Sequence, residues 1–476
     1  MATLNILELL RDNANEKADK LALKDSNRQL TYQELFFEVL EKSSFIKECG
    51  FNNSPIVVKV NRSLDVVVTF FSILLSGNYY IPVDEDIPNY KLEKIIKASS
   101  AKAFIAFNDE QLAIPRIHFS EPKNSLRFEY FAKEFDENKY AYIMFTSGST
   151  GEPKGVIKTI KNINAFVDNF TSNFPYILEE NIANQAPFFF DASMKDIYLS
   201  LKLGATLFIP DKTVFSLPME TINYLNKNKI TMIYWVPSIL SMIAKTRTLN
   251  YVKPEYLKYV FFVGEVFPPK YLNMWIESLP NIQYFNTYGS TEVMGVVATY
   301  EIKSRIEDEY IPIGKAIFGN TLKLDNEEII VESEQVALRY LNVENNQTFE
   351  HHDDIHRLRT GDYGRYDEDG NIVFVSRKDF QIKHLGYRIE LQEIENAIND
   401  FSYIDQSCAV YNGEKDLIYL FVVLNQELDN PTKTILNDAK EKLQFYMIPN
   451  KVVVLDKMPL NKNGKIDRTE LKGKAM

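Results

Sequence analysis

The chain has 476 residues, a formal net charge of −11 and two cysteines. This length predicts two or three domains, and the acidic balance argues against nucleic acid as the main partner, because phosphate backbones need a basic face. Cys49 and Cys408 lie too far apart in sequence to indicate a disulfide framework or a metal site. The first 20 residues are amphipathic and carry acids, unlike a signal peptide, and the longest apolar run, 66–75, is about half of a bilayer span. We therefore expect a soluble cytoplasmic protein without a membrane or nucleic-acid partner.

Strand-like and helix-like segments alternate along most of the chain. Thr31 is a candidate N-cap for the first clear helix. The expected strands are 56–60, 103–106, 142–145, 206–209, 232–235, 259–263 and 283–285. The expected helices are 63–75, 161–170, 194–201, 238–245 and 270–278. The alternation predicts a doubly wound α/β architecture. Ligands in such sheets bind at the carboxyl ends of strands, so the loops after Phe145, Val263 and Phe285 should carry the chemistry.

The most informative stretch follows the strand that ends at Phe145. It reads Thr146-Ser147-Gly148-Ser149-Thr150-Gly151-Glu152-Pro153-Lys154-Gly155. Glycines let backbone N–H groups converge on an anion, the hydroxyls add donors, and Lys154 adds a positive charge. The loop is not a Walker loop, because Pro153 precedes Lys154 and Gly155 follows it. A solvated turn is the alternative, but this density of hydroxyl and glycine residues favours a phosphate-binding loop.

This loop resembles the signature of the adenylate-forming (AMP-binding) superfamily, which includes acyl-CoA synthetases, luciferases and the adenylation domains of nonribosomal peptide synthetases. Further motifs follow in that family's order: Asn286-Thr287-Tyr288-Gly289-Ser290-Thr291-Glu292, Arg359-Thr360-Gly361-Asp362 and Asn463-Gly464-Lys465-Ile466-Asp467-Arg468. The resemblance implies an α/β fold with a large N-terminal domain of doubly wound mixed sheets, 1–378, and a small α+β C-terminal lid domain, 379–476.

The same resemblance implies ATP and Mg²⁺ as cofactors. Tyr288 would pack on adenine, Thr291 would reach a phosphate, and Glu292 would bind Mg²⁺. Lys465, Thr146 and Glu292 would be catalytic, with Lys465 bridging the substrate carboxylate and the α-phosphate, although Asn463-Gly464 alone would indicate only a hairpin turn. The implied nucleotide-binding residues are Thr146, Ser147, Gly148, Ser149, Thr150, Lys154, Asn286, Thr287, Tyr288, Thr291, Asp362, Arg377 and Lys465.

Asp191 comes directly after three phenylalanines, where a carboxylate is costly to bury without a cationic partner. In amino-acid-activating relatives the matching Asp holds the substrate ammonium, whereas a helix N-cap is the alternative role for Asp191 or Ser193. An inward Lys195 would pair with an acidic substrate side chain, and an outward Lys195 would pair with solvent or Asp196. The pocket implied by residue-for-residue transfer is Asp191, Ala192, Lys195, Tyr234, Phe261, Val263, Thr287, Gly295 and Val296.

The function that the resemblance implies is ATP-dependent activation of an amino acid as an aminoacyl-adenylate, followed by transfer to the phosphopantetheine thiol of a separate carrier protein, or to CoA. The lid would rotate about Asp379 and present Gly386 during the thiol step. The motifs are most similar to D-alanine:carrier-protein ligases and peptide-synthetase adenylation domains, but the D-alanine enzymes carry a Cys where Val263 stands. An aryl- or acyl-acid:CoA ligase and a non-catalytic nucleotide-binding relative are the alternatives.

A histidine-rich segment precedes Asp362. His351, His352 and His356 stand with Asp353 and Asp354, too tightly spaced for the usual i, i+4 ligand pair. The pattern favours a solvated polar loop over a metal site.

Overall fold

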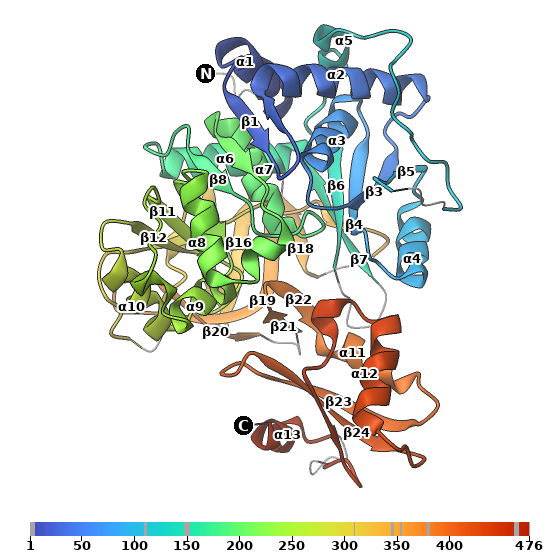
Figure 1. Ribbon diagram of the computed structural model, residues 1–476, viewed down its shortest axis with the longest axis vertical. Helices are drawn as coiled ribbons and strands as arrows, with labels where there is room; N and C mark the ends of the chain where they lie inside the picture. The colour runs from blue at the N-terminus through green and yellow to red at the C-terminus, as the bar shows by residue number, and fades with distance from the viewer. Residues whose placement is uncertain are drawn as a thin grey trace. The chain divides into compact units, whose positions relative to one another are not determined.

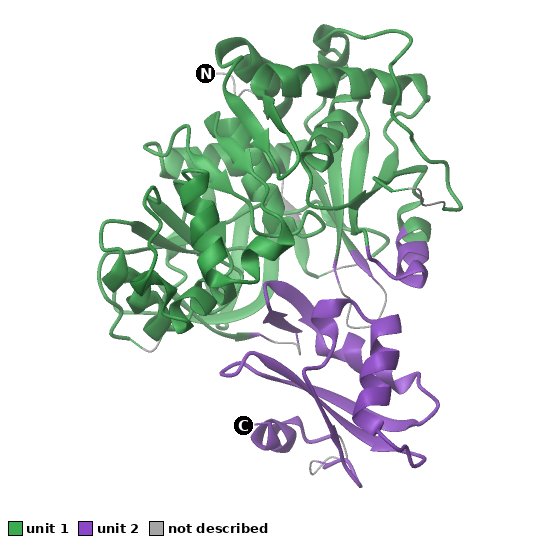
Figure 2. Cartoon of the chain, in the orientation of Figure 1, with its two compact units in different colours: residues 1–85, 96–145, 155–376 green, residues 86–95, 146–154, 377–476 purple. Residues whose placement is uncertain are grey.

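The computed structural model describes residues 5–108, 112–146, 153–308, 310–343, 347–352, 355–377, 381–460 and 466–475. The chain forms two compact units, shown in green and purple in Figure 2, and each is described by itself. The first unit comprises Met1–Glu85, Ile96–Phe145 and Gly155–Ser376, and the second comprises Asp86–Ile95, Thr146–Lys154 and Arg377–Met476. The predicted boundary between residues 378 and 379 stays a prediction, because residues 378–380 lie outside the described residues.

One sheet of the first unit carries two of the three strands that the sequence analysis expected to end at the site, those that contain Val263 and Phe285, whereas the strand that contains Phe145 belongs to the second sheet (Figure 1). The first sheet has the order β14 (Lys315–Ala316), β13 (Ala298–Ile302), β12 (Gln283–Tyr288), β11 (Tyr259–Val263), β10 (Met232–Trp235), β8 (Asn181–Ala183), β9 (Thr206–Phe208), β1 (Leu21–Lys24) and β2 (Gln29–Thr31). Strands β8, β10, β11 and β12 run parallel, so their carboxyl ends meet at one edge of the sheet. The register pairs Val263 with Thr287, which brings the ends of β11 and β12 together.

A second sheet has the order β17 (Arg339–Tyr340), β7 (Lys154–Thr159), β6 (Tyr140–Thr146), β4 (Tyr79–Asp84), β3 (Pro55–Val60) and β5 (Ala103–Ile105). Strands β7, β4 and β3 are almost wholly buried and rich in Val and Ile, as expected for strands covered on both faces. A third sheet holds β15 (Asn320–Asp325), β16 (Glu328–Ser333), β19 (Ile355–Tyr366) and β18 (Phe349–His352), with β20 (Ile372–Arg377) paired to β19.

Helices pack against these sheets. Thr31 caps α2 through a capping box, because its side chain accepts from the backbone N–H of Glu34 and the Glu34 side chain accepts in return from the Thr31 N–H. The N-cap prediction for Thr31 is therefore confirmed. The helices that lie wholly in the first unit are α1 (Ile6–Glu16), α2 (Tyr32–Glu48), α3 (Leu64–Leu75), α5 (Phe128–Ala132), α6 (Ile160–Asn173), α7 (Asp191–Leu203), α8 (Pro218–Lys227), α9 (Pro237–Lys245) and α10 (Pro269–Ser278), whereas α4 (Asn89–Ser99) is divided between the two units.

The second unit is α+β. Its elements are β21 (Gln381–His384), β22 (Tyr387–Glu390), α11 (Leu391–Asn399), β23 (Ile404–Asn412), β24 (Leu417–Leu424), α12 (Pro431–Lys442), β25 (Lys451–Val454) and α13 (Arg468–Lys474). Strands β21 and β22 form a hairpin whose turn contains Leu385 and Gly386, both with positive φ. A second, longer hairpin of β23 and β24 pairs in parallel with β25.

The predicted α/β fold class is confirmed, and the expected strands and helices lie where the sequence analysis placed them, within a few residues. One prediction was wrong. The histidine-rich segment is not a loop, because β18 and β19 pair with His351 opposite His356. The charged side chains on these strands make the segment resemble a polar loop in the sequence. In the structure they pair between the strands, as Arg357 on β19 does with Glu350 on β18 at 3.1 Å. Across the described residues, no helix is both long and apolar enough to cross a membrane.

Candidate active site

Asp191 is the anchor of the candidate site in the first unit. It is the first residue of α7 and is 8% exposed, and the hydroxyl of Tyr142 on β6 donates to its Oδ1 at 2.8 Å. Burial raises the pKa of Asp191 to about 6, although the positive charge of Lys158 and the Tyr142 hydrogen bond both lower it. The capping alternative is not seen, because Phe190 occupies the N-cap position and Ser193 Oγ donates to the Phe190 carbonyl oxygen.

Lys195, one turn further along α7, points inward. Its side chain is buried, its Nζ donates to the Ala192 carbonyl oxygen at 2.6 Å, and it lies 4.4 Å from the centre of the Tyr234 ring. Burial lowers the pKa of Lys195, whereas the negative charges of Asp196 and Asp191 raise it. The ammonium of Lys195 therefore has a carbonyl, an aromatic face and nearby negative charge within the protein itself.

Aromatic side chains on the neighbouring strands β10, β11 and β12 pack against one another beside Lys195. The Tyr234 hydroxyl donates to Thr287 Oγ1 at 2.9 Å, and the Phe261 ring lies 4.9 Å from the Tyr234 ring and is stacked 4.6 Å from Phe285. Val263 is buried at the end of β11, opposite Thr287 in the register. The predicted pocket residues on these three strands are therefore brought together.

Gly295 and Val296, the last two predicted pocket residues, lie between β12 and β13 in the chain. Gly295 has φ +67°, and a Cβ there would lie 2.2 Å from the Phe166 ring, so only glycine fits. The Val296 carbonyl oxygen accepts from Gln335 Nε2 at 2.9 Å. The preceding residue, Met294, contacts the tyrosine that holds Asp191, because the Tyr142 hydroxyl lies 3.0 Å from the Met294 sulfur.

Several side chains of the predicted nucleotide-binding motif at the end of β12 form hydrogen bonds with other groups of the protein. Asn286 Nδ2 donates to the Pro312 carbonyl oxygen at 2.7 Å, and Thr287 Oγ1 donates to the Phe262 carbonyl oxygen at 2.9 Å. Tyr288 is buried, and its hydroxyl donates to Asp362 Oδ2 at 2.5 Å. The two predicted nucleotide contacts Tyr288 and Asp362 therefore lie side by side although 74 positions separate them.

Glu292 is 4% exposed, and Tyr340 on β17 donates its hydroxyl to Glu292 Oε1 at 2.8 Å. Thr291, the residue before it, is partly exposed. An ionised carboxylate is the hard oxygen ligand that Mg²⁺ prefers, so this residue fits the predicted metal role. Among the described residues, no group of three or more His, Cys, Asp or Glu side chains could hold a metal by itself. A metal here would complete its shell with substrate oxygens and water, as Mg²⁺ commonly does beside phosphates.

Lys158 is the charged residue that sequence reasoning missed. It lies on β7, is fully buried, and its Nζ has no hydrogen-bond partner within the described part of the chain. Burial lowers its pKa to about 8, although the negative charges of Asp191 and Glu292 raise it. Tyr142 and Tyr340 were missed as well, because aromatic residues in apolar strands read as core.

The second unit contains the remaining described candidates. Thr146 Oγ1 lies 3.4 Å from the Lys154 carbonyl oxygen, where β6 ends and β7 begins. Arg377 and Lys154 are partly exposed, and Gly386 has φ +82° as expected for a tight turn. Ser147, Gly148, Ser149, Thr150, Asp379 and Lys465 lie outside the described residues.

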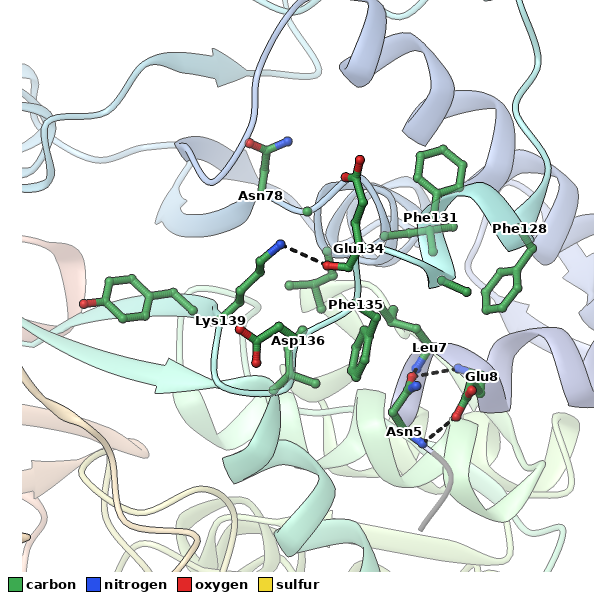
Figure 3. A pocket seen from close by; sticks show the side chains of 16 residues that line it. Asn5, Leu7, Glu8, Asn78, Phe128, Phe131, Glu134, Phe135, Asp136 and Lys139 are labelled. Atoms are coloured by element: carbon green, nitrogen blue, oxygen red, sulfur yellow. Dashed lines mark hydrogen bonds between the residues drawn. The ribbon is translucent and has the colours of Figure 1, made fainter. Parts of the chain in front are cut away.

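A cavity of about 110 Å³ lies elsewhere in the first unit (Figure 3). It is lined by residues of α1, α3 and α5 and of the segment before β6, including Phe128, Phe131 and Lys139. Lys139 points across it and donates to the Glu134 carbonyl oxygen. None of the predicted site residues lines this cavity.

Two family descriptions match the chain. The AMP-binding enzyme family matches residues 10–341, and the AMP-binding enzyme C-terminal domain matches residues 393–465. The chain belongs to the AMP-binding enzymes. The family predicted from the motifs is therefore confirmed.

Similar proteins cover this AMP-binding enzyme almost completely. The D-alanine--D-alanyl carrier protein ligase of Staphylococcus aureus (strain MRSA252) is 31% identical, with 98% of both chains covered. The ligase of the same name from Bacillus licheniformis is 30% identical and covers 98% of this chain and 99% of its own. Among solved structures, the Vibrio cholerae adenylation domain AlmE in complex with glycyl-adenosine-5'-phosphate matches with TM-score 0.84 at 20% identity, over 99% of this chain and 96% of that one. This last likeness concerns the fold.

Proposed function

We propose that this chain is an ATP-dependent amino acid:carrier-protein ligase. It forms an aminoacyl-adenylate and pyrophosphate from an amino acid and ATP, and then transfers the aminoacyl group to the phosphopantetheine thiol of a separate carrier protein, releasing AMP. Family membership over both parts of the chain supports the reaction class. The carrier-protein ligases that cover almost its full length support the kind of substrate and acceptor.

The single observation that carries the amino-acid assignment is the buried carboxylate of Asp191. Burial disfavours the ionised form of Asp191, in line with its raised pKa. A substrate ammonium would compensate this desolvation cost with a charge-assisted hydrogen bond. Tyr142 fixes the orientation of this carboxylate through one oxygen, Oδ1. An uncharged aryl or acyl chain would leave Asp191 without a cation from the substrate.

D-alanine is the first substrate to test, because the relatives at 31% and 30% identity are D-alanine ligases. Lys195 does not require an acidic substrate, since Ala192, Tyr234 and the nearby charge of Asp196 already satisfy its ammonium. We therefore expect a neutral side chain beside Lys195. An acidic amino acid remains the competing outcome in the same screen.

For the nucleotide, we propose that Tyr288 meets the adenine and that Asp362 binds the ribose, with their mutual hydrogen bond holding both in place. Thr291, Thr146, Lys154, Arg377 and the loop residues Ser147, Gly148, Ser149 and Thr150 would surround the phosphates. The side chains of Asn286 and Thr287 already form hydrogen bonds within the protein, so these residues would contact the nucleotide through their backbone. Glu292 would hold Mg²⁺, which when bound neutralises phosphate charge.

Lys465 is the proposed catalytic cation, because fixed positive charge stabilises the charge that develops at the α-phosphorus. Replacing it should slow adenylation about 10²-fold or more, by analogy with losing one preorganised oxyanion donor. We further propose that Asp379 is the hinge of a lid and that Gly386 serves the thiol step. A cytoplasmic location is proposed because the reaction consumes ATP.

ATP–pyrophosphate exchange over D- and L-amino acids and aryl acids tests the activity. We expect exchange with one or a few neutral amino acids, D-alanine first, and its loss in the Lys465→Ala variant. Exchange with benzoates and none with amino acids would identify an aryl-acid ligase instead. Absence of AMP and pyrophosphate formation with every acid would overturn the proposal. Loading of a phosphopantetheinylated carrier protein, compared with CoA, then identifies the acceptor.

A further inference from the structure

A buried glutamine holds the segment that contains two of the predicted pocket residues. Gln335 lies between β16 and β17 and is 0% exposed. Its Nε2 donates to the carbonyl oxygen of Met294 at 2.7 Å and to that of Val296 at 2.9 Å. Its Oε1 accepts from Asn169 Nδ2 at 2.8 Å and from Asn320 Nδ2 at 3.0 Å. A glutamine side chain has two N–H donors and two lone pairs on its oxygen, so all four are used.

These four partners fix the direction in which the amide faces. Backbone carbonyl oxygens only accept hydrogen bonds, so the nitrogen of Gln335 must face Met294 and Val296. Asn169 on α6 and Asn320 at the start of β15 hold the oxygen. Turning the amide would leave several buried polar groups unpaired at once, which is costly. The side chain of Gln335 is therefore a rigid support.

Helix α6 also anchors the backbone on both sides of Gln335. Asn162 Nδ2 donates to the carbonyl oxygens of Glu334 at 2.6 Å and Val336 at 3.0 Å. Asn162 and Asn169 both lie on α6, so one helix fixes both the backbone and the side chain of this support.

The segment 294–296 depends on this support because it belongs to neither β12 nor β13. The Met294 N–H donates to the carbonyl oxygen of Gln335 at 2.8 Å, and Val293 forms an isolated antiparallel bridge with Val336. Buried backbone groups need partners, and the Gln335 amide supplies the two donors that a neighbouring strand would supply in a sheet. The two carbonyl oxygens that it holds lie on either side of Gly295 in the chain.

The same segment connects Gln335 to Asp191. The Met294 sulfur lies 3.0 Å from the Tyr142 hydroxyl, which donates to Asp191 Oδ1. One buried apolar cluster contains this segment together with predicted pocket residues and the ring that Gly295 faces: Met294, Val296, Phe166, Tyr234, Phe261 and Val263. A shift of the segment would therefore change the packing around Asp191.

We propose that Gln335 is a positioning residue that sets the selectivity of the site for the size of the amino-acid side chain. By holding the backbone on both sides of Gly295, it fixes how closely the segment 294–296 approaches the space beside Asp191. A fixed apolar boundary distinguishes two substrates that differ by one methylene about 10- to 200-fold. This inference rests on the proposed function, because it needs an amino acid whose ammonium binds Asp191.

ATP–pyrophosphate exchange with the full-length protein tests the proposal. It gives kcat/KM for D-alanine and for D-2-aminobutyrate, which is one methylene longer. If another amino acid exchanges faster in the screen, it is compared with its own homologue that is one methylene longer. The wild type should prefer the smaller amino acid of the pair about 10-fold or more.

Gln335→Met keeps nearly the same length but removes both donors, so two buried carbonyl oxygens lose their partners and the segment 294–296 has to move. We expect the ratio of the two kcat/KM values to fall about fivefold or more, mainly through the KM for each amino acid, while the KM for ATP stays within about twofold. Asn273→Leu is the matched control. Asn273 is also a buried amide, but it holds the backbone of Ile306, outside the candidate site. This control should keep the wild-type ratio.

An unchanged ratio in Gln335→Met, an equal fall in Asn273→Leu, or a wild type that does not distinguish the two amino acids would overturn the proposal. A purely structural Gln335 would lower both rates by the same factor.

If Gln335→Met does not fold, Asn320→Ala takes its place. Asn320 is partly exposed, and the change removes one of the two donors to Gln335 Oε1. Its ratio should fall about twofold or more, and an unchanged ratio would overturn the proposal. Failure of the proposed function has a different signature, because the wild type would then show no exchange with any amino acid.

Discussion

Tyr142→Phe removes one hydroxyl and should shift the pH dependence of amino-acid activation. The hydroxyl donates to Asp191 Oδ1 at 2.8 Å, and both residues are buried. A hydrogen bond to a charged group contributes about 1.5–3 kcal/mol, and one pKa unit corresponds to about 1.4 kcal/mol, so the loss should raise the pKa of Asp191 by about 1–2 units. Starting from about 6, the pKa of this carboxyl in the variant becomes about 7–8.

The sign of the effect follows from which form of Asp191 binds the substrate. The ionised carboxylate pairs with the ammonium, so kcat/KM for the amino acid falls as the pH drops through the folded-state pKa. In the wild type, this fall occurs below about pH 6. In Tyr142→Phe it begins 1–2 units higher, so we expect about a 2- to 10-fold loss at pH 7 and a rate within about twofold of the wild type at pH 9.

Pyrophosphate exchange as a function of amino-acid concentration, measured from pH 5.5 to 9.5, gives the profile. Tyr284→Phe is the control, because Tyr284 is also a buried strand tyrosine, but its hydroxyl donates to the carbonyl oxygens of Trp275 and Leu279. Its profile should keep the wild-type midpoint. A Tyr142→Phe variant that is slower by the same factor at every pH would refute the reasoning, since the hydroxyl would then act only in packing.

Asp191→Asn should abolish amino-acid-dependent exchange and stabilise the fold. Burial raises the pKa of Asp191 from 3.8 to about 6, so the wild type loses stability as the pH rises through this window. The variant should therefore be more stable than the wild type by up to about 3 kcal/mol at pH 7 and by almost nothing at pH 4, measured by thermal unfolding at both pH values. Glu292→Gln should slow exchange about 10²-fold and raise the Mg²⁺ concentration for half-maximal rate, checked by titrating Mg²⁺; an unchanged Mg²⁺ dependence would remove Glu292 from the metal role. Gly289→Ala should destabilise the protein by about 1–3 kcal/mol in a denaturant melt, because a Cβ there lies 2.3 Å from the backbone oxygen of Gly295; an unchanged melting curve would mean that the loop after β12 can yield.

The backbone elements could be predicted because local patterns specify them. The strands expected at 232–235 and 259–263 have the same ends as β10 and β11, since short apolar runs between polar turns mark buried parallel strands. Asp191 could be singled out as a candidate because its carboxylate directly follows three phenylalanines, where burial without a cationic partner is costly, and its role stays a prediction. These signals lie within a few residues of one another in the sequence.

The partners of the anchor could not be predicted, because they depend on how distant elements pack. Tyr142 reads as one more apolar residue of β6, and only the packing of α7 brings Asp191 to its hydroxyl. A lysine inside a strand normally indicates a solvated face, yet Lys158 is buried because both faces of β7 are covered. The β18–β19 hairpin was hidden for the converse reason, since its charged residues pair across the strands at the surface.

The sign of the Asp191→Asn effect on stability separates two explanations for the buried charges of the site. Replacing a single member of a structural ion pair leaves an uncompensated charge and destabilises the fold. A carboxylate that waits for a substrate cation is instead costly in the empty protein, so its neutral isostere stabilises the fold and loses activity. The raised pKa of Asp191 and the lowered pKa of Lys158 both indicate the second situation, since each shift disfavours the charged form in the folded state. A destabilised Asp191→Asn variant would therefore count against Asp191 as the substrate site.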